Sequence, residues 1–174
     1  EKDNRDALTL RGNAYYQLGE LETAKEHYRQ ALKFDPEHGG SKEGHRQIKK
    51  LSAHLDKAQA AMKAQQFQQA VTHLEGLIAA DPQHKLFVVS AYTDLGVAHK
   101  GLGKFPQAKA AIGEVLKREP ENINALRVMG EIQLENEEFQ EAINTLRKAH
   151  ELNNGDQMVL QALQRAEAAL KQSK

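Results

Sequence analysis

The sequence predicts an all-α fold, a right-handed superhelical solenoid of repeated helical hairpins that ends in a C-terminal capping helix. Two observations predict it. A short apolar pattern recurs four times along the chain, and the composition is 40% apolar but only 5% aromatic, without Trp. With so little ring area, burial must be spread over many small Ala and Leu contacts, which packed helices provide.

The end of each repeat is marked by an alanine twelve residues before a proline. The pairs are Ala24 and Pro36, Ala70 and Pro82, and Ala108 and Pro120, with Ala142 and Asn154 as a fourth pair in which Asn takes the proline position. Because proline cannot continue a helix, the second helix of each unit is predicted to end there. The chain therefore reads as one unit written four times.

Each unit contains two apolar helical stripes separated by a turn. A small residue lies in the first stripe, where two helices must approach closely, and a large apolar residue follows the turn. The small residues are Gly12, Ala58, Gly96 and Gly130, and the large ones are Leu21, Phe67, Phe105 and Phe139. These are features of the tetratricopeptide repeat, a helix–turn–helix of about 34 residues.

The spacing of the repeats is uneven. They begin near Arg5, Leu51, Val89 and Ile123, so the steps are 46, 38 and 34 residues. The four extra residues of the second step, around "HKLF", predict either a longer loop or one added helical turn. In the first step we expect "HGG" to break the chain, Ser41 to cap a helix, and that helix to run to about Ala64, roughly 35 Å long.

This pattern predicts four regions. Residues 1–40 are the last repeat of an upstream group, and residues 41–64 are a long connector helix that merges into the first helix of the next repeat. Residues 51–156 hold three repeats, and residues 157–174 form the capping helix, with Asp156 as its N-cap and an apolar stripe at Leu160, Leu163, Ala166 and Leu170. Because the first residues enter a helical pattern at once, we expect a piece of a longer protein, monomeric by itself.

The charge balance argues against several classes of partner. Lys and Arg together number 24, as do Asp and Glu, so no net field attracts nucleic acid or a membrane surface. Cysteine is absent, which excludes disulfides, zinc ribbons and thiol nucleophiles. No apolar run has membrane-spanning length, and no signal peptide is expected.

Residue patterns for catalysis or metal binding are missing. The eight histidines include no pair four residues apart and no HExxH, so surface or packing roles are expected for them. The glycines form neither a phosphate-binding loop nor GxGxxG, and the acidic run "ENEEFQEA" lacks the alternating ligands of a calcium loop. The sequence predicts no catalytic residue, no cofactor, no metal and no enzyme activity.

The remaining candidate is a protein-binding groove on the first helices of the repeats, which line the inner surface of such arrays. Its residues mix apolar, polar and charged side chains, which suits a peptide segment better than a phosphate. An alternative remains open, in which several of them only pack on neighbouring helices. The candidate groove residues are Asn13, Tyr16, Leu55, Gln59, Met62, Ser90, Val97, Arg127 and Leu134.

One well-known tetratricopeptide mechanism can be tested on the sequence. Many such domains hold the acidic tail of cytosolic Hsp70 or Hsp90 in a clamp of Lys, Asn, Asn, Lys and Arg, through charge-assisted hydrogen bonds. Its five positions fall on Leu55, Gln59, Asp94, Asn124 and Val128, or one repeat earlier on Thr9, Asn13, Asp56, Ser90 and Asp94. Only Asn13 matches, and Asp where an anion should bind is repulsive, so no clamp is predicted.

Three segments resemble a known family. They are "EVLKREPENINALRVMGEIQLENEEFQEAINTLRKAHELNNGDQ", "LQRAEAALKQS" and "HRQIKKL". The chain resembles the endoplasmic-reticulum co-chaperones of the DnaJ homolog subfamily C member 3 type, which join tetratricopeptide repeats to a J domain and were first named as inhibitors of the double-stranded-RNA-activated kinase. In that family "LKQS" stands immediately before the J domain.

The resemblance implies a location in the lumen of the endoplasmic reticulum and three kinds of partner. These are unfolded or partly folded clients, the lumenal Hsp70 through a J domain outside this fragment, and kinases of translation initiation factor 2. A cytosolic J-protein with tetratricopeptide repeats, which acts with Hsp70 and Hsp90 in the cytoplasm, is the alternative. A scaffold without a chaperone role is a third interpretation.

Overall fold

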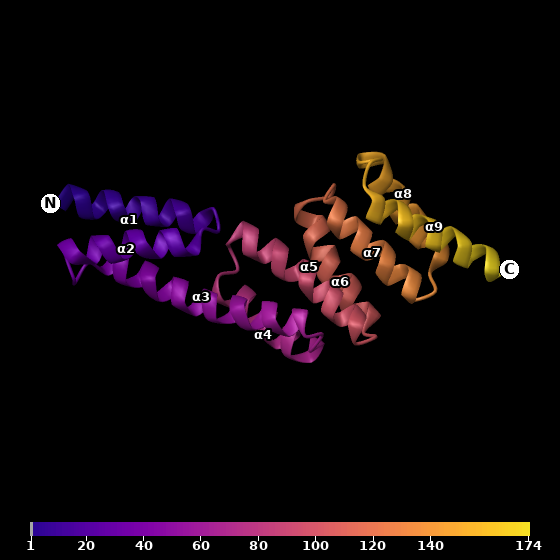
Figure 1. Ribbon diagram of the computed structural model, residues 1–174, viewed down its shortest axis with the longest axis horizontal. Helices are drawn as coiled ribbons and strands as arrows, with labels where there is room; N and C mark the ends of the chain where they lie inside the picture. The colour runs from indigo at the N-terminus through magenta and orange to yellow at the C-terminus, as the bar shows by residue number, and fades with distance from the viewer. Residues whose placement is uncertain (1) are drawn as a thin grey trace.

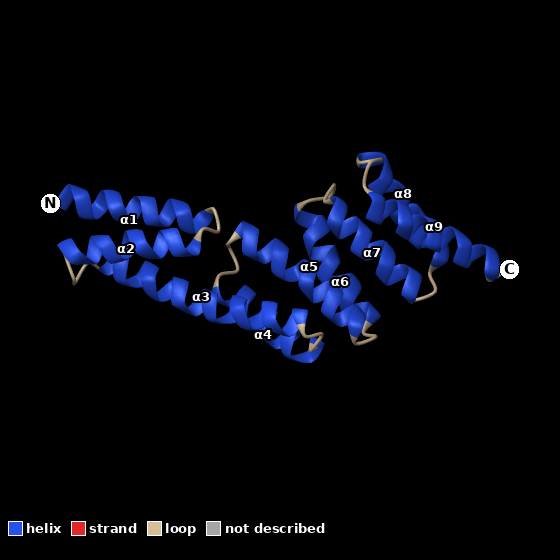
Figure 2. Ribbon diagram, in the orientation of Figure 1, coloured by secondary structure: helices blue, strands red, loops and turns tan. Residues whose placement is uncertain are grey.

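The structure, a computed structural model, describes residues 2–174, and over this range every regular element is a helix (Figures 1 and 2). In chain order the helices are α1 (Lys2–Gln17), α2 (Leu21–Phe34), α3 (Gly39–Lys63), α4 (Phe67–Ala80), α5 (Lys85–Gly101), α6 (Phe105–Arg118), α7 (Ile123–Glu135), α8 (Phe139–Leu152) and α9 (Gln157–Gln172). They form the predicted solenoid, which is elongated with the two chain ends far apart (Figure 1).

Successive helices pair into four hairpins, α1 with α2, α3 with α4, α5 with α6 and α7 with α8. The second helix of each hairpin begins at the large apolar residue predicted for that position, Leu21, Phe67, Phe105 or Phe139. Each also ends two residues before the proline position of its repeat. The turn and stop signals in the sequence are therefore confirmed.

The extra residues between repeats are absorbed as helix. Helix α7 has 13 residues, α5 has 17 and α3 has 25. The second step therefore adds a helical turn, one of the two options that the sequence allowed. The first step lengthens α3, and the predicted long helix is confirmed.

The predicted start of that helix was wrong. Helix α3 begins at Gly39 because His38 is its N-cap, with Nδ1 accepting a hydrogen bond from the backbone N–H of Ser41 at 3.3 Å. Ser41 is buried inside the helix, and its hydroxyl lies 2.7 Å from Thr9 Oγ1 on α1. "HGG" thus initiates the helix instead of breaking the chain, since an imidazole nitrogen supplies the acceptor that the first turn needs.

Small residues allow the helices of a hairpin to cross closely. A Cβ added at Gly12 would lie 2.7 Å from Tyr28 Cε1, and Cβ atoms at Gly96 and Gly130 would overlap Ile112 and Leu146. Real Cβ atoms essentially never approach that closely, so any larger residue at these positions would force the facing side chain to shift. The prediction of close helix approach is confirmed at all three.

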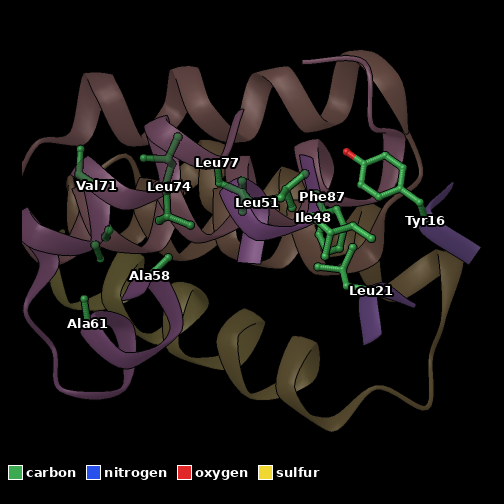
Figure 3. Close-up of a cluster of buried hydrophobic side chains, with 14 of the residues drawn as sticks. Tyr16, Leu21, Ile48, Leu51, Ala58, Ala61, Val71, Leu74, Leu77 and Phe87 are labelled. Atoms are coloured by element: carbon green, nitrogen blue, oxygen red, sulfur yellow. The ribbon is translucent and has the colours of Figure 1, made fainter. Parts of the chain in front are cut away.

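The apolar core is continuous across the long helix. One cluster of buried side chains runs from Tyr16 on α1, through Ile48 and Leu51 on α3, to Leu95 on α5. Figure 3 shows Tyr16, Leu21, Ile48 and Phe87 gathered at one end of this cluster. The remaining clusters, between α5 and α9, are smaller and join neighbouring helices, as expected of a solenoid.

Helix α9 covers the end of the array, as predicted for a capping helix. Asp156 Oδ1 accepts hydrogen bonds from the backbone N–H groups of Met158 and Val159, so the predicted N-cap is confirmed. Leu163 and Ala166 are buried, whereas Leu160 is half-buried. The division of the chain into an upstream repeat, a connector and three further repeats remains a prediction.

Candidate functional site

Two hollows lie between successive first helices of the hairpins. We call the first, between α1 and α3, the joint pocket, and it has a volume of about 580 Å³. Its lining comes from α1, α2, the N-terminal half of α3 and the loop between α4 and α5. The lining residues are Asn13, Tyr16, Gln17, Tyr28, Gly40, Glu43, Gly44, Gln47 and Asp81.

Tyr28 forms the buried end of the joint pocket. Its ring lies against two glycines 32 residues apart, because a Cβ at Gly12 would come within 2.7 Å of it and one at Gly44 within 2.5 Å. The Tyr28 hydroxyl donates a hydrogen bond to Asn13 Oδ1. Burial raises the pKa of Tyr28, which therefore stays a neutral donor.

The far wall of the pocket links helices distant in sequence. The Tyr16 hydroxyl donates to Asp81 Oδ2 at 2.6 Å, and His84 Nε2 donates to the Tyr16 carbonyl oxygen at 2.7 Å. His84 Nδ1 then accepts from the Phe87 backbone N–H at 3.3 Å and caps α5. Burial, followed by the hydrogen bond to Asp81, raises the pKa of Tyr16 above its ordinary value.

We call the second hollow, between α5 and α7, the distal pocket, and its volume is about 330 Å³. Burial raises the pKa of the Asp94 carboxyl in its wall. The distal pocket is also bordered by acidic and amide side chains. Its lining residues are Leu86, Val89, Ser90, Thr93, Asp94, Glu119, Asn122 and Asn124.

A network of ion pairs also links the first helices α5 and α7. Glu131 on α7 accepts from Lys100 Nζ on α5 at 3.2 Å and from Arg127 Nη1 at 2.6 Å. All three side chains are only 17–18% exposed. Arg127 also donates to Asn124 Oδ1 at 2.7 Å, so its guanidinium is held within the protein.

The predicted groove residues separate into three groups. Asn13 and Tyr16 line the joint pocket, Ser90 lines the distal pocket, and Gln59 is exposed. Arg127 belongs to the ion-pair network. The apolar members pack instead on the core clusters while half-buried, as the alternative interpretation allowed. They are Leu55, Met62, Val97 and Leu134.

Sequence reasoning missed most of the joint pocket. Gly40, Glu43, Gly44 and Gln47 recur at intervals of three and four residues, which places them on one face of α3. That signal was readable, but it was obscured by the expectation that the chain breaks at Gly39 and Gly40. Asp81 joins the site from a loop, and no sequence pattern predicts that.

Neither a metal cluster nor a membrane-spanning helix is found in the part of the chain that the structure describes. Among the side chains that the structure describes, residues 4–174, no group of three or more His, Cys, Asp or Glu is arranged to hold a metal ion. No helix of the described chain is both long and apolar enough to cross a bilayer.

Known proteins with similar sequences include members of the DnaJ family. The DnaJ protein P58IPK homolog B of Oryza sativa subsp. japonica is 32% identical over all 174 residues of this chain, which spans 37% of that protein. DnaJ homolog subfamily C member 3 of Homo sapiens is 30% identical over 99% of the chain, which spans 34% of that protein. The chain thus corresponds to about a third of the length of these relatives.

The fold has a close counterpart among solved structures. The crystal structure of the P58(IPK) TPR domain matches all of this chain with a TM-score of 0.86 and 29% identity, and the match covers 48% of that domain. Two models of the tetratricopeptide repeat match residues 6–38, and residues 55–90 with 93–156. Since the second alone covers more than half of the sequence, the chain belongs to the tetratricopeptide-repeat family.

Proposed function

We propose that this chain is a protein-binding module of a co-chaperone with tetratricopeptide repeats and a J domain. In this proposal its first-helix face holds segments of unfolded or partly folded clients, and a J domain outside the chain engages the lumenal Hsp70 of the endoplasmic reticulum. The observation that carries the proposal is the match of the whole chain to the P58(IPK) TPR domain. The resemblance also makes initiation-factor-2 kinases candidate partners.

The surface chemistry is compatible with this role. The joint and distal pockets are open hollows bordered by amides, hydroxyls and carboxylates beside apolar side chains. Such surfaces can hydrogen-bond an extended main chain while accommodating varied side chains. A non-enzymatic role follows from the same proposal.

Binding can be tested with reduced, carboxymethylated α-lactalbumin, which cannot fold, as a fluorescent probe. The double variant Gln59→Arg with Ser90→Arg changes two exposed positions of the first-helix face. If the face binds the probe, this variant should bind it more weakly, so the fluorescence anisotropy of the probe should rise less when the variant is added. The control pair, Gln161→Arg with Gln164→Arg, adds the same charge to exposed positions on α9 and should leave binding unchanged. Equal binding by both pairs would contradict the proposal.

A cytosolic role with an Hsp70 or Hsp90 tail is less compatible with the geometry. Of the positions that a clamp would occupy, Val128 is buried at 1% exposure and Thr9 is buried at 8%. Asp94 presents a carboxyl to the distal pocket, where an acidic tail would be repelled. A peptide ending in Glu-Glu-Val-Asp should therefore give no heat of binding by calorimetry, and micromolar affinity would reinstate the cytosolic alternative.

The cellular part of the proposal needs the intact parent protein. Protease protection of the parent in isolated microsomes should distinguish the lumen from the cytoplasm. A parent gene that does not continue into a J domain after Lys174 would favour a scaffold without a chaperone role.

A further inference from the structure

We infer that the joint pocket is a binding site for a basic side chain, Arg or Lys, of an extended peptide segment. The inference rests on the proposed function, that the first-helix face binds protein segments, and adds which segments are preferred. The joint pocket has a volume of about 580 Å³, within the range of roughly 300–1,000 Å³ typical of ligand pockets.

The charge of the lining favours a cation. Among the described residues that line the pocket, Glu43 and Asp81 are carboxylates and none is Lys or Arg. Asp81 is the C-cap residue of α4, so it lies at the helix end where the backbone dipole also favours positive charge. The chain as a whole carries no net charge, so this preference is local to the pocket.

Asp81 retains capacity to accept further hydrogen bonds. Its Oδ2 accepts from the Tyr16 hydroxyl and its Oδ1 from the Gln83 backbone N–H at 3.1 Å. An ionised carboxylate offers about four acceptor sites. A guanidinium or ammonium entering the pocket can therefore bond to Asp81 without breaking the link to Tyr16.

Glu43 already has a weak internal partner. Arg46 lies 2.7 Å from Glu43, but their side chains are 73% and 65% exposed. Such pairs contribute only about 0–1 kcal/mol, so a ligand cation can replace Arg46 at small cost. Arg46 thus competes with the ligand for Glu43. Removing Glu43 should therefore weaken ligand binding, and removing Arg46 should strengthen it.

The other lining groups suit a peptide main chain. Asn13 uses its amide oxygen for Tyr28, which leaves the amide nitrogen free to donate to a ligand carbonyl. Gln47 donates to the Ala80 carbonyl at 2.7 Å and keeps its own oxygen as an acceptor for a ligand N–H. Gly40 lies in the first turn of α3, where backbone N–H groups have no intrahelical acceptor.

The probe is the peptide acetyl-Ala-Ala-Arg-Ala-Ala-amide, whose only charge is the guanidinium, and its Leu counterpart is the control ligand. Amide NMR spectra of the chain report binding through the signals of Gly40 and Gly44 in the pocket, with Gly113 on α6 as a remote reference. The Arg peptide should shift the two pocket signals and not that of Gly113. The Leu peptide should leave all three unshifted.

Variants give the sign of each contribution. Asp81→Asn, which keeps an acceptor for Tyr16, should raise the Kd of the Arg peptide about tenfold or more. Glu43→Gln should raise it about twofold to fivefold, whereas Arg46→Gln should lower it. The control Glu119→Gln, in the distal pocket, should have no effect. Thermal unfolding establishes that each variant is folded.

Equal shifts with the Arg and Leu peptides, or an unchanged Kd in Asp81→Asn, would overturn the inference. Binding of the unfolded probe protein with no response to the Arg peptide would refute the inference and leave the proposed function standing. A response to the Arg peptide without binding of the unfolded protein would refute the proposed function instead.

Discussion

Tyr16 and Asp81 are joined by a hydrogen bond of 2.6 Å although 65 residues separate them. The bond connects α1 of the first hairpin to the loop that precedes α5 of the third. Together with the bond from His84 to the Tyr16 carbonyl oxygen, it makes a joint across the long helix α3. The first hairpin is therefore fixed to the remainder by side-chain bonds as well as by the continuous core.

Replacing His84 by Ala should destabilise the chain by about 2–3 kcal/mol, because α5 loses its N-cap and the Tyr16 carbonyl loses a buried donor. The measurement is the free energy of unfolding in urea. His38→Ala is the control, because His38 caps α3 in the same way but is more exposed. It should cost about 1 kcal/mol. Equal losses in both variants would show that the joint contributes nothing.

Alkaline pH should destabilise the fold through Tyr16 and Tyr28, since burial raises the pKa of both hydroxyls. Above the ordinary tyrosine pKa of about 10, the unfolded chain releases these protons while the folded chain keeps them. The unfolded state then binds fewer protons, so stability is complete below that pH and falls as pH rises. Urea unfolding between neutral pH and about pH 11 should show the decline, with a shallower slope in Tyr16→Phe.

Ile48→Pro should separate the first hairpin from the rest. Ile48 is 1% exposed in the middle of α3, and proline there costs about 3 kcal/mol or more by removing a helical hydrogen bond and distorting the helix. Hydrogen exchange should show lost protection in α1 and α2, with α5 to α9 still protected. Uniform loss across all helices would mean that the array unfolds as a single unit.

Two glycine substitutions should have opposite signs. Gly130→Ala places a Cβ against Leu146, so overpacking should destabilise the chain by about 1–3 kcal/mol. A Cβ at Gly113, in the interior of α6, meets no atom within 4 Å among the described residues, so Gly113→Ala should stabilise by up to about 1 kcal/mol. Thermal melts give the change in Tm for each variant. A change of the same sign in both would contradict the difference in packing between Gly130 and Gly113.

Glu131→Gln should cost about 1–3 kcal/mol, because Lys100 and Arg127 would lose a shared, half-buried carboxylate. Glu135 also pairs with Lys100, at 3.4 Å, but is 51% exposed. Glu135→Gln should therefore cost at most about 0.5 kcal/mol. The comparison uses urea unfolding at low and high salt, and equal effects would mean that burial does not strengthen the network.

The sequence by itself determined the hairpins. The signals are local or short-range. They are helix periodicity, a small residue such as Gly130 at each crossing, a large residue such as Phe139 after each turn and a proline position after each second helix. Each acts within one repeat, where neighbouring helices are also neighbours in sequence. The surplus of twelve residues likewise predicted a long helix, although not its first residue.

Only the tertiary structure decided how the hairpins are joined and what lines the joint pocket. His38 caps α3 with its ring beside Ser41 and Thr9, which are both buried. Asp81 reaches the pocket because the loop between α4 and α5 lies beside Tyr16 of α1. Four contacts across the joint connect residues 29–68 positions apart: Thr9 with His38 and with Ser41, Tyr16 with Asp81, and His84 with the Tyr16 carbonyl. Their formation depends on the length and direction of α3, so no local pattern of residues could specify them.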